Sequence, residues 1–228
     1  DFVLKVVTER HLANRQAGFA ENEIFDVIEN AEDEMLQNGI VAVGDICNNT
    51  LTIPQKSKGR LQYHNFIEAR DFIPALAEER FQTSVSILDE YRSTLNAQRS
   101  TLSPHAPYSV SPGMFGMIND LPNNNLLTIH NQETLAENEF FEKGTGDFLR
   151  LYKQMGIDIP FFKSSGKKSL QTWLPHFTKE QSIILVHNVC TSAEDLEFIK
   201  RTTNNQQRTT FFCLCPNANL YISNALPD

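Results

Sequence analysis

The chain has 228 residues, of which 40% are apolar and 21% charged, and its formal net charge is −8. This composition is ordinary for a soluble globular protein, and the length suits one large domain over residues 1–228. The acidic balance argues against nonspecific nucleic-acid binding, and no apolar run approaches the length of a membrane span. Four cysteines without zinc-type pair spacing, and the lack of a signal-peptide pattern, predict reduced thiols in the cytoplasm.

Predicted helices and strands alternate along the chain. Helical spacing of apolar residues predicts helices over residues 22–38, 74–98, 137–141, 147–155 and 191–200, with a further helix beginning at Ser111-Pro112. Apolar runs predict strands over residues 40–46, 61–69, 101–110, 126–133, 182–189 and 209–216. All four cysteines lie in or beside strands expected to be buried: Cys47, Cys190, Cys213 and Cys215. This order predicts an α/β fold with a parallel sheet, either open and doubly wound or closed into a barrel.

Three histidines stand at the ends of three predicted strands: His105, His130 and His187. Polar residues just past such strands lie at the carboxyl edge of the sheet, where α/β enzymes keep their chemistry. One histidine of this kind is commonly a packed core residue, whereas three together suggest a shared metal or proton-transfer site. Because the strand ends of a barrel converge on one mouth, and no glycine-rich phosphate loop is present, the pattern favours a barrel.

Four short motifs follow one another in the chain. They are the segments 104–111 (PHAPYSVS), 130–133 (HNQE), 185–188 (LVHN) and 215–219 (CPNAN). Together they resemble the amidohydrolase superfamily, in the branch of aminohydrolases and chlorohydrolases that includes guanine, S-adenosylhomocysteine and aminodeoxyfutalosine deaminases. The resemblance implies a (β/α)8 TIM-type barrel of the metal-dependent hydrolase kind, with one divalent metal, zinc or iron, at its mouth.

The resemblance also implies roles for residues at the strand ends. His130 matches a metal-ligating histidine, Glu133 the acid/base glutamate, and His187 the histidine that contacts the metal or its water. A divalent metal lowers the pKa of bound water from near 16 to roughly 7. Glu133 would then carry a proton from that water to the leaving amine, while His187 orients the nucleophile or stabilises the oxyanion. A structural reading of Glu133 also stays open, since a carboxylate near a helix start favours the helix dipole.

Four further residues are implied as substrate contacts: His105, Tyr108, Asn217 and Asn219. A purely structural role for His105 remains an alternative, because prolines flank it on both sides at positions 104 and 107. Asp45 and Glu68 also fall near predicted strand ends, where lining the site and a structural role are equally open.

The chain departs from the family pattern in its metal ligands. The family also uses a His-X-His pair on the first barrel strand and an aspartate on the eighth, and this sequence contains no His-X-His. Both ends look truncated, so we expect a partial barrel of about strands 2 to 7 within a longer protein. The predicted activity is metal-dependent hydrolysis of a C–N bond, as in cyclic amidines, within a small heterocyclic or nucleoside-like substrate.

Two other readings remain at this point. The chain could be a catalytically inactive, metal-free barrel fragment that binds a small ligand or self-associates through its open edges, for example as a homodimer. A hydrolase with two metals is a weaker alternative, because no lysine stands at a convincing strand end to bridge the ions.

Overall fold

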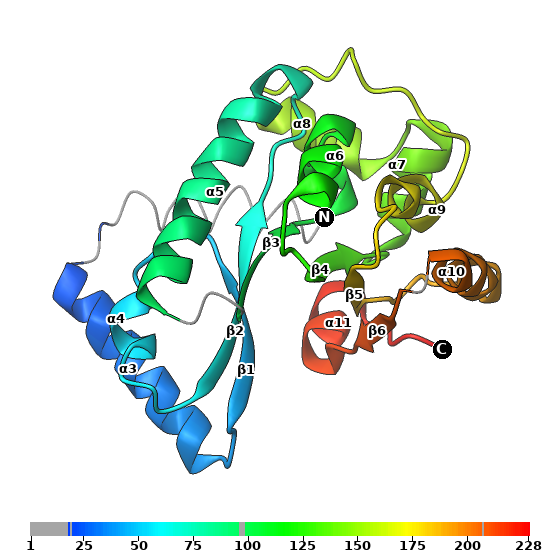
Figure 1. The fold of residues 1–228 in the computed structure, drawn as a ribbon. Coiled ribbons are helices and arrows are strands. Elements are labelled where there is room, and N and C mark those ends of the chain that lie inside the picture. Colours follow the sequence, from blue (N-terminus) through cyan, green and yellow to red (C-terminus); the bar gives the residue numbers. More distant parts are fainter. Residues whose placement is uncertain (1–17, 19, 96–98, 207) are drawn as a thin grey trace.

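A computed structural model describes residues 18, 20–95, 99–206 and 208–228 of the chain. The fold is α/β and contains two three-stranded parallel sheets (Figure 1). The first sheet has the order β1 (Ala42–Cys47), β2 (Gln62–Ala69), β3 (Ser100–Pro104), and the second has the order β4 (Leu126–Asn131), β5 (Ser182–His187), β6 (Thr210–Cys213). All six predicted strands and their parallel pairing are therefore confirmed.

Among the described residues, one helix precedes β1, one follows β6, and the others lie between consecutive strands (Figure 1). They are α3 (Glu21–Gln37), α4 (Ile53–Lys56), α5 (Ala77–Thr94), α6 (Pro112–Asp120), α7 (Leu135–Lys143), α8 (Asp147–Gln154), α9 (Ser169–Trp173), α10 (Ala193–Gln206) and α11 (Pro216–Ser223). Within the described residues, 3-10 turns occur at Pro74–Leu76, Pro107–Ser109 and Leu174–His176. The predicted helices are confirmed, except that the helix expected from residue 74 begins as a 3-10 turn, and its residues 96–98 lie outside the described residues.

Several strands end earlier than their apolar runs predict. Gln132 has a φ of 46°, and His187 and Asn188 have φ values of 77° and 59°. A left-handed backbone turns the chain out of the strand, so β4 and β5 stop at these points. Prolines shorten β3 and β6. Pro107 begins a 3-10 turn soon after β3, and Pro216 begins α11 soon after β6.

The two sheets meet where β3 lies beside β4 (Figure 1). The backbone N–H of His130 donates to the carbonyl of His105 at 3.0 Å. The N–H of Thr128 donates to the Ser103 hydroxyl oxygen at 3.1 Å. These two bonds place the carboxyl ends of all strands from β2 to β5 at one edge of the molecule.

The apolar core lies between the strands and the outer helices. Residues without measurable exposure come from both layers: Ile67, Leu102, Leu127 and Leu185 from the strands, and Leu88, Tyr91, Met114 and Ile118 from α5 and α6. A second, mostly aromatic cluster packs α7 and α8 beside the carboxyl ends of the strands: Phe72, Phe140, Phe141, Phe148, Leu151 and Tyr152. The site described below therefore has a close-packed base and an aromatic neighbour.

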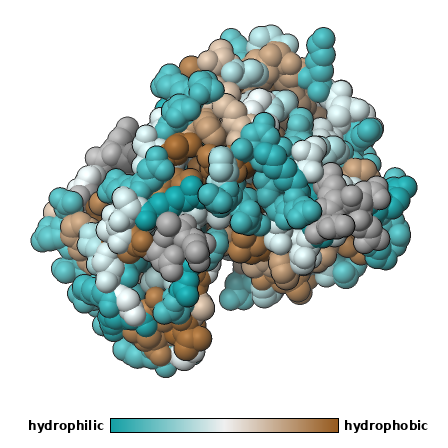
Figure 2. Space-filling view, in the orientation of Figure 1, coloured by the Kyte–Doolittle hydropathy of each residue, from teal (hydrophilic) through white to brown (hydrophobic). Residues whose placement is uncertain are grey.

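The outer strands are more exposed than the sequence predicts. Within the described residues, β1 and β6 each pair on one side only. Val41 is 75% exposed and Phe211 50%, and Cys213, expected in a buried strand, is exposed. Figure 2 shows apolar surface on both sides of the indentation between the β1 end and the α11 end of the molecule. The prediction of burial is thus confirmed for Cys47 at the end of β1, which is 5% exposed, and wrong for Cys213 in β6.

None of the described helices combines the length and the apolar character that a membrane crossing needs.

Candidate functional site

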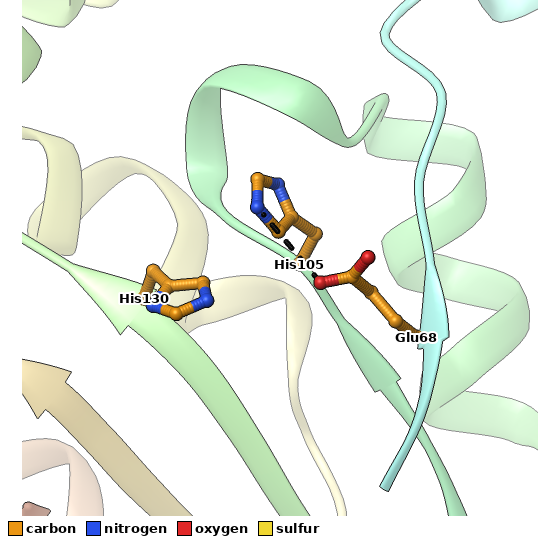
Figure 3. Close-up of side chains that lie close together, drawn as sticks. All are labelled: Glu68, His105 and His130. Carbon is orange, nitrogen blue, oxygen red and sulfur yellow. Dashed lines mark ion pairs between the residues drawn. The ribbon is translucent and has the colours of Figure 1, made fainter. Parts of the chain in front are cut away.

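Three ligand-type side chains converge at the carboxyl edge of the strands (Figure 3). Glu68 comes from β2, His105 directly follows β3, and His130 lies on β4. One ligand atom from each lies within 4.8 Å of the others, and among the described residues they form the one such group of three. They line a small pocket of about 180 Å³, a volume that includes the solvent at its mouth.

The orientation of His105 follows from the turn after β3. Its Nδ1 lies 2.6 Å from the Ser109 hydroxyl, which belongs to the 3-10 turn Pro107–Ser109. This bond leaves Nε2 free to face Glu68, whose Oε1 lies 3.8 Å away. The ring of His105 meets that of His130 edge-on, with centroids 5.1 Å apart. The proline-flanked turn thus aims the imidazole into the pocket.

A second functional pair lies beside this group. Nε2 of His187, at the end of β5, is 3.4 Å from Oε1 of Glu133. Nδ1 of His187 is 2.8 Å from Oδ1 of Asn219 on α11, and Asn219 Nδ2 donates to the His187 carbonyl. The rings of His130 and His187 stack with centroids 5.2 Å apart. Three histidines therefore form a continuous row with a carboxylate at each end.

The backbone is strained where the two loops leave β4 and β5. Gln132, His187 and Asn188 all have positive φ, and a left-handed conformation costs a non-glycine residue about 1–2 kcal/mol. Such residues persist where the surrounding structure over-determines them, and they concentrate at functional sites. The strain therefore marks the same place as the histidine row.

Buried amide side chains hold these two loops together. Asn131 Nδ2 donates to Asn188 Oδ1 at 3.2 Å, and the indole N–H of Trp173 donates to Asn131 Oδ1 at 3.2 Å. Gln132 Nε2 donates to Asp195 at 3.1 Å, and the Thr191 hydroxyl donates to Gln132 Oε1 at 2.7 Å. A polar network of this kind fixes one arrangement, because every broken bond would leave a buried polar group unpaired.

Burial controls the protonation of the site. Burial, with a smaller contribution from His130, lowers the pKa of His105 to about 3. Burial, with a smaller contribution from His187, lowers the pKa of His130 to about 4. Burial also raises the pKa of Glu133 and Glu68, although His187 lowers the pKa of Glu133 and Arg70 lowers that of Glu68. His105 and His130 are thus neutral at pH 7, the form in which imidazole binds a metal.

The structure brings together most of the site residues predicted from the sequence. His105, His130, Glu133, His187 and Asn219 share the strand-end edge. The sequence-based assignment of the metal to His130 and His187 differs from the group of ligand atoms described above, which contains His130 but not His187.

The two remaining predicted substrate contacts lie farther out. The ring of Tyr108 is 6.0 Å from that of His105 and packs against Phe148 at 4.3 Å, so it joins the pocket to the aromatic cluster. Asn217 is exposed at the start of α11. Their roles as substrate contacts stay predictions.

Glu68 is the residue that sequence reasoning undervalued, since it ranked no higher than Asp45. Position along the strands separates the two. Asp45 pairs in register with Asn65 and forms an ion pair with Lys56 at 2.6 Å, whereas Glu68 pairs in register with Ser103 and lines the pocket. Side chains alternate along a strand, so residues 65 and 68 of β2 face opposite sides of the sheet. Because Asp45 is in register with Asn65, Asp45 and Glu68 also face opposite sides.

Comparisons with known proteins find several similar solved structures, including three deaminases, while no family model and no curated protein matches the chain. Aminofutalosine deaminase of Helicobacter pylori is 25% identical with a TM-score of 0.75, over 90% of this chain and 50% of that one. An adenosine deaminase from Xanthomonas campestris with bound zinc is 17% identical with a TM-score of 0.66, over 99% of this chain and 46% of that one. Guanine deaminase from C. acetobutylicum with bound guanine is 13% identical with a TM-score of 0.59, over 89% of this chain and 48% of that one.

All three proteins are deaminases of the amidohydrolase superfamily, so the resemblance predicted from the motifs is confirmed. The two less identical structures support the fold alone. The chain spans about half the length of each protein. The parallel α/β arrangement is consistent with part of a TIM-type barrel.

Proposed function

We propose that this chain, which resembles the deaminases of the amidohydrolase superfamily, carries the central part of the active site of a metal-dependent aminohydrolase. The reaction is hydrolysis of a C–N bond in a small heterocyclic or nucleoside-like substrate. The observation that carries the proposal is the row of three histidines, flanked by Glu68 and Glu133, at the carboxyl edge of β2 to β5. Catalytic residues of barrel enzymes come from the ends of several strands in this way.

The residues at this edge fit a divalent metal such as zinc or iron. His130 Nδ1 is buried without a partner among the described residues, and its imidazole is neutral because burial lowers its pKa to about 4. Neutral imidazoles and a carboxylate are suitable ligands for either metal. Of the residues on this chain, His130 would hold the ion together with His105 and Glu68, or with His187. When bound, the ion supplies water with a pKa near 7.

His187 and Glu133 provide a path for the proton. Asn219 Oδ1 is an acceptor, and its orientation is set because Asn219 Nδ2 donates to the His187 carbonyl. His187 therefore keeps a hydrogen on Nδ1 and directs Nε2 at Glu133. Burial raises the pKa of Glu133, which makes it a better carrier of a proton from the attacking water to the leaving nitrogen.

The substrate that we propose is a planar polar ring that approaches the site past Tyr108. The ring of Tyr108 lies 6.0 Å from that of His105 and packs against Phe148 of the aromatic cluster. The deaminase structure that is 25% identical to this chain supports a nitrogen-containing substrate. A nitrogen heterocycle is the substrate class that we propose, and the cytoplasm is the location.

The first test is the metal content of the purified chain, measured by elemental mass spectrometry after dialysis without chelator. We expect about one zinc or iron per chain, as for a mononuclear site. His130→Ala should lose it, whereas His176→Gln should retain it, because His176 stacks on Phe115 away from the site. Screening of amino-substituted heterocycles for ammonia release follows. A chain with neither metal nor ammonia release, in the presence of added zinc or iron, would contradict the proposal.

A further inference from the structure

We infer that Glu137 is a positioning residue, which holds the turn at Gln132 and Glu133 and thereby aims the Glu133 carboxylate at His187. The inference rests on the proposed function for the catalytic role of Glu133. The geometry that supports it belongs to the chain itself and can be tested without an assay of activity.

Glu137 lies in the first turn of α7 and has no measurable exposure. Its two carboxylate oxygens accept different backbone donors. Oε1 accepts the N–H of Gln132 at 3.0 Å, and Oε2 accepts the N–H of Glu133 at 3.3 Å. Both oxygens of one buried carboxylate are therefore used to hold two consecutive residues of the loop after β4.

This arrangement differs from ordinary helix capping. A glutamate at the third helical position usually reaches back to the N–H of the N-cap residue, which here is Thr134. Glu137 passes over Thr134 and binds the two residues before it. The target of the carboxylate is thus the turn that carries Glu133, in addition to the start of α7.

The turn needs such support because its backbone is strained. Gln132 has a φ of 46°, which a residue with a side chain rarely adopts. Residues in this conformation persist only where surrounding contacts over-determine it. The bonds from Glu137 fix the amide on each side of the Gln132 α-carbon, so they are well placed to impose that conformation.

The same turn is also tied to the loop that follows His187. The Gln132 carbonyl accepts the N–H of Cys190 at 2.9 Å, and its side chain bonds Thr191 and Asp195. Glu137 therefore fixes the backbone of Glu133 in a turn that is itself bonded to the loop after His187, and His187 is the residue that faces the Glu133 carboxylate. Without the bonds from Glu137, the bonds from Gln132 to Cys190, Thr191 and Asp195 would remain, but the backbone N–H of Glu133 would no longer be held.

The decisive variant is Glu137→Gln, which keeps the shape of the side chain. A carboxamide has one acceptor oxygen, and its NH2 group would face a backbone N–H, so one of the two bonds is lost. Glu139→Gln is the matched control, because Glu139 lies on the same helix and accepts a bond from Thr145 instead. Both variants replace a carboxyl group by an amide of the same shape.

The first readout is the energetic coupling between Glu133 and His187. It is measured by a double-mutant cycle of Glu133→Gln and His187→Asn on the free energy of unfolding, in each background. We expect the coupling to fall toward zero with Glu137→Gln and to persist with Glu139→Gln. If Glu137→Gln does not fold, Glu137→Asp replaces it, since the shorter acid keeps the charge but does not reach both amides.

The second readout is catalysis, in the protein as it exists. Glu137→Gln should lower kcat on the order of 10- to 100-fold, because a small misplacement of a catalytic group is costly, while KM stays nearly constant. Retained coupling in Glu137→Gln would overturn the inference, whether or not the chain is active. Lost coupling in a chain that releases no ammonia from any substrate would support the inference while the proposed function fails.

Discussion

The imidazole of His187 lies 3.4 Å from the carboxylate of Glu133, and this pair joins the loops that follow β4 and β5. Asn219 holds the other ring nitrogen of His187, and Glu137 holds the backbone of Glu133. His187 and Glu133 are thus each held by a buried side chain that lies outside the pair. A pair supported on both sides keeps its geometry without a ligand, which is the preorganisation that proton transfer requires.

Replacement of Glu133 tests the proton-transfer role. Glu133→Gln should lower kcat by roughly 10²- to 10⁴-fold, because the amide cannot carry a proton. The variant should still fold, because the isosteric amide fits beside His187. The measurements are ammonia release and urea unfolding, with Glu142→Gln on α7 as the control. Equal rates for the two variants would remove Glu133 from the mechanism.

The lowered pKa values of His105 and His130 predict acid sensitivity. Both fall below the ordinary value of 6.5, to about 3 and about 4, so the unfolded chain binds more protons than the folded one. The stability of the folded state is therefore fully retained above pH 6.5 and decreases as the pH falls toward 4. At pH 5 each of these two histidines should lower the free energy of unfolding by about 1–2 kcal/mol relative to neutral pH.

Urea unfolding between pH 7 and 5, with a chelator present, measures this dependence. His130→Gln removes one of the two groups, so its free energy of unfolding should fall less steeply with acidification than that of the parent chain. An unchanged slope in His130→Gln would show that His130 is not held neutral by the fold.

An ion pair outside the site makes an asymmetric prediction. Lys56 Nζ lies 2.6 Å from Asp45 and 2.8 Å from Asn65 Oδ1, and the side chains of Lys56 and Asp45 are 3% and 33% exposed. Asp45→Asn leaves a buried ammonium without an anion and should cost about 3–5 kcal/mol. Lys56→Met leaves a carboxylate that water can reach, so its cost should be smaller. Thermal and urea unfolding of the two variants give the order, and the reverse order would contradict the burial of Lys56.

Asn131 should contribute strongly to the stability of the loops. Asn131→Ala leaves the indole N–H of Trp173 and Oδ1 of Asn188 without their partners, which should cost about 1–3 kcal/mol for each unpaired group. The matched control is Asn217→Ala, an exposed residue for which a change within about 0.5 kcal/mol is expected. Similar urea midpoints for the two variants would mean that the buried amide network adds nothing to stability.

The sequence alone determined the order of elements and the strand-end histidines. Apolar runs ending in His130 and His187 are sufficient to place both at the carboxyl edge, because parallel strands share one direction. Ser111 and Pro112 marked the start of α6 correctly, since capping and proline chemistry act within a few residues. The ordered motifs further identified the resemblance to deaminases, which the similar structures confirm.

Only the tertiary structure decided which polar residues meet. Glu68 and Asp45 look alike in the sequence, but side-chain alternation and strand register place Glu68 beside His105 and send Asp45 to Lys56. The strained backbone of Gln132 and the reach of Glu137 are equally invisible, because each depends on contacts between residues whose backbone is set by the fold. The exposure of Phe211 and Phe212 likewise does not follow from their apolar character, because within the described residues β6 pairs with β5 alone. Local patterns specify elements, whereas long-range pairing specifies the site.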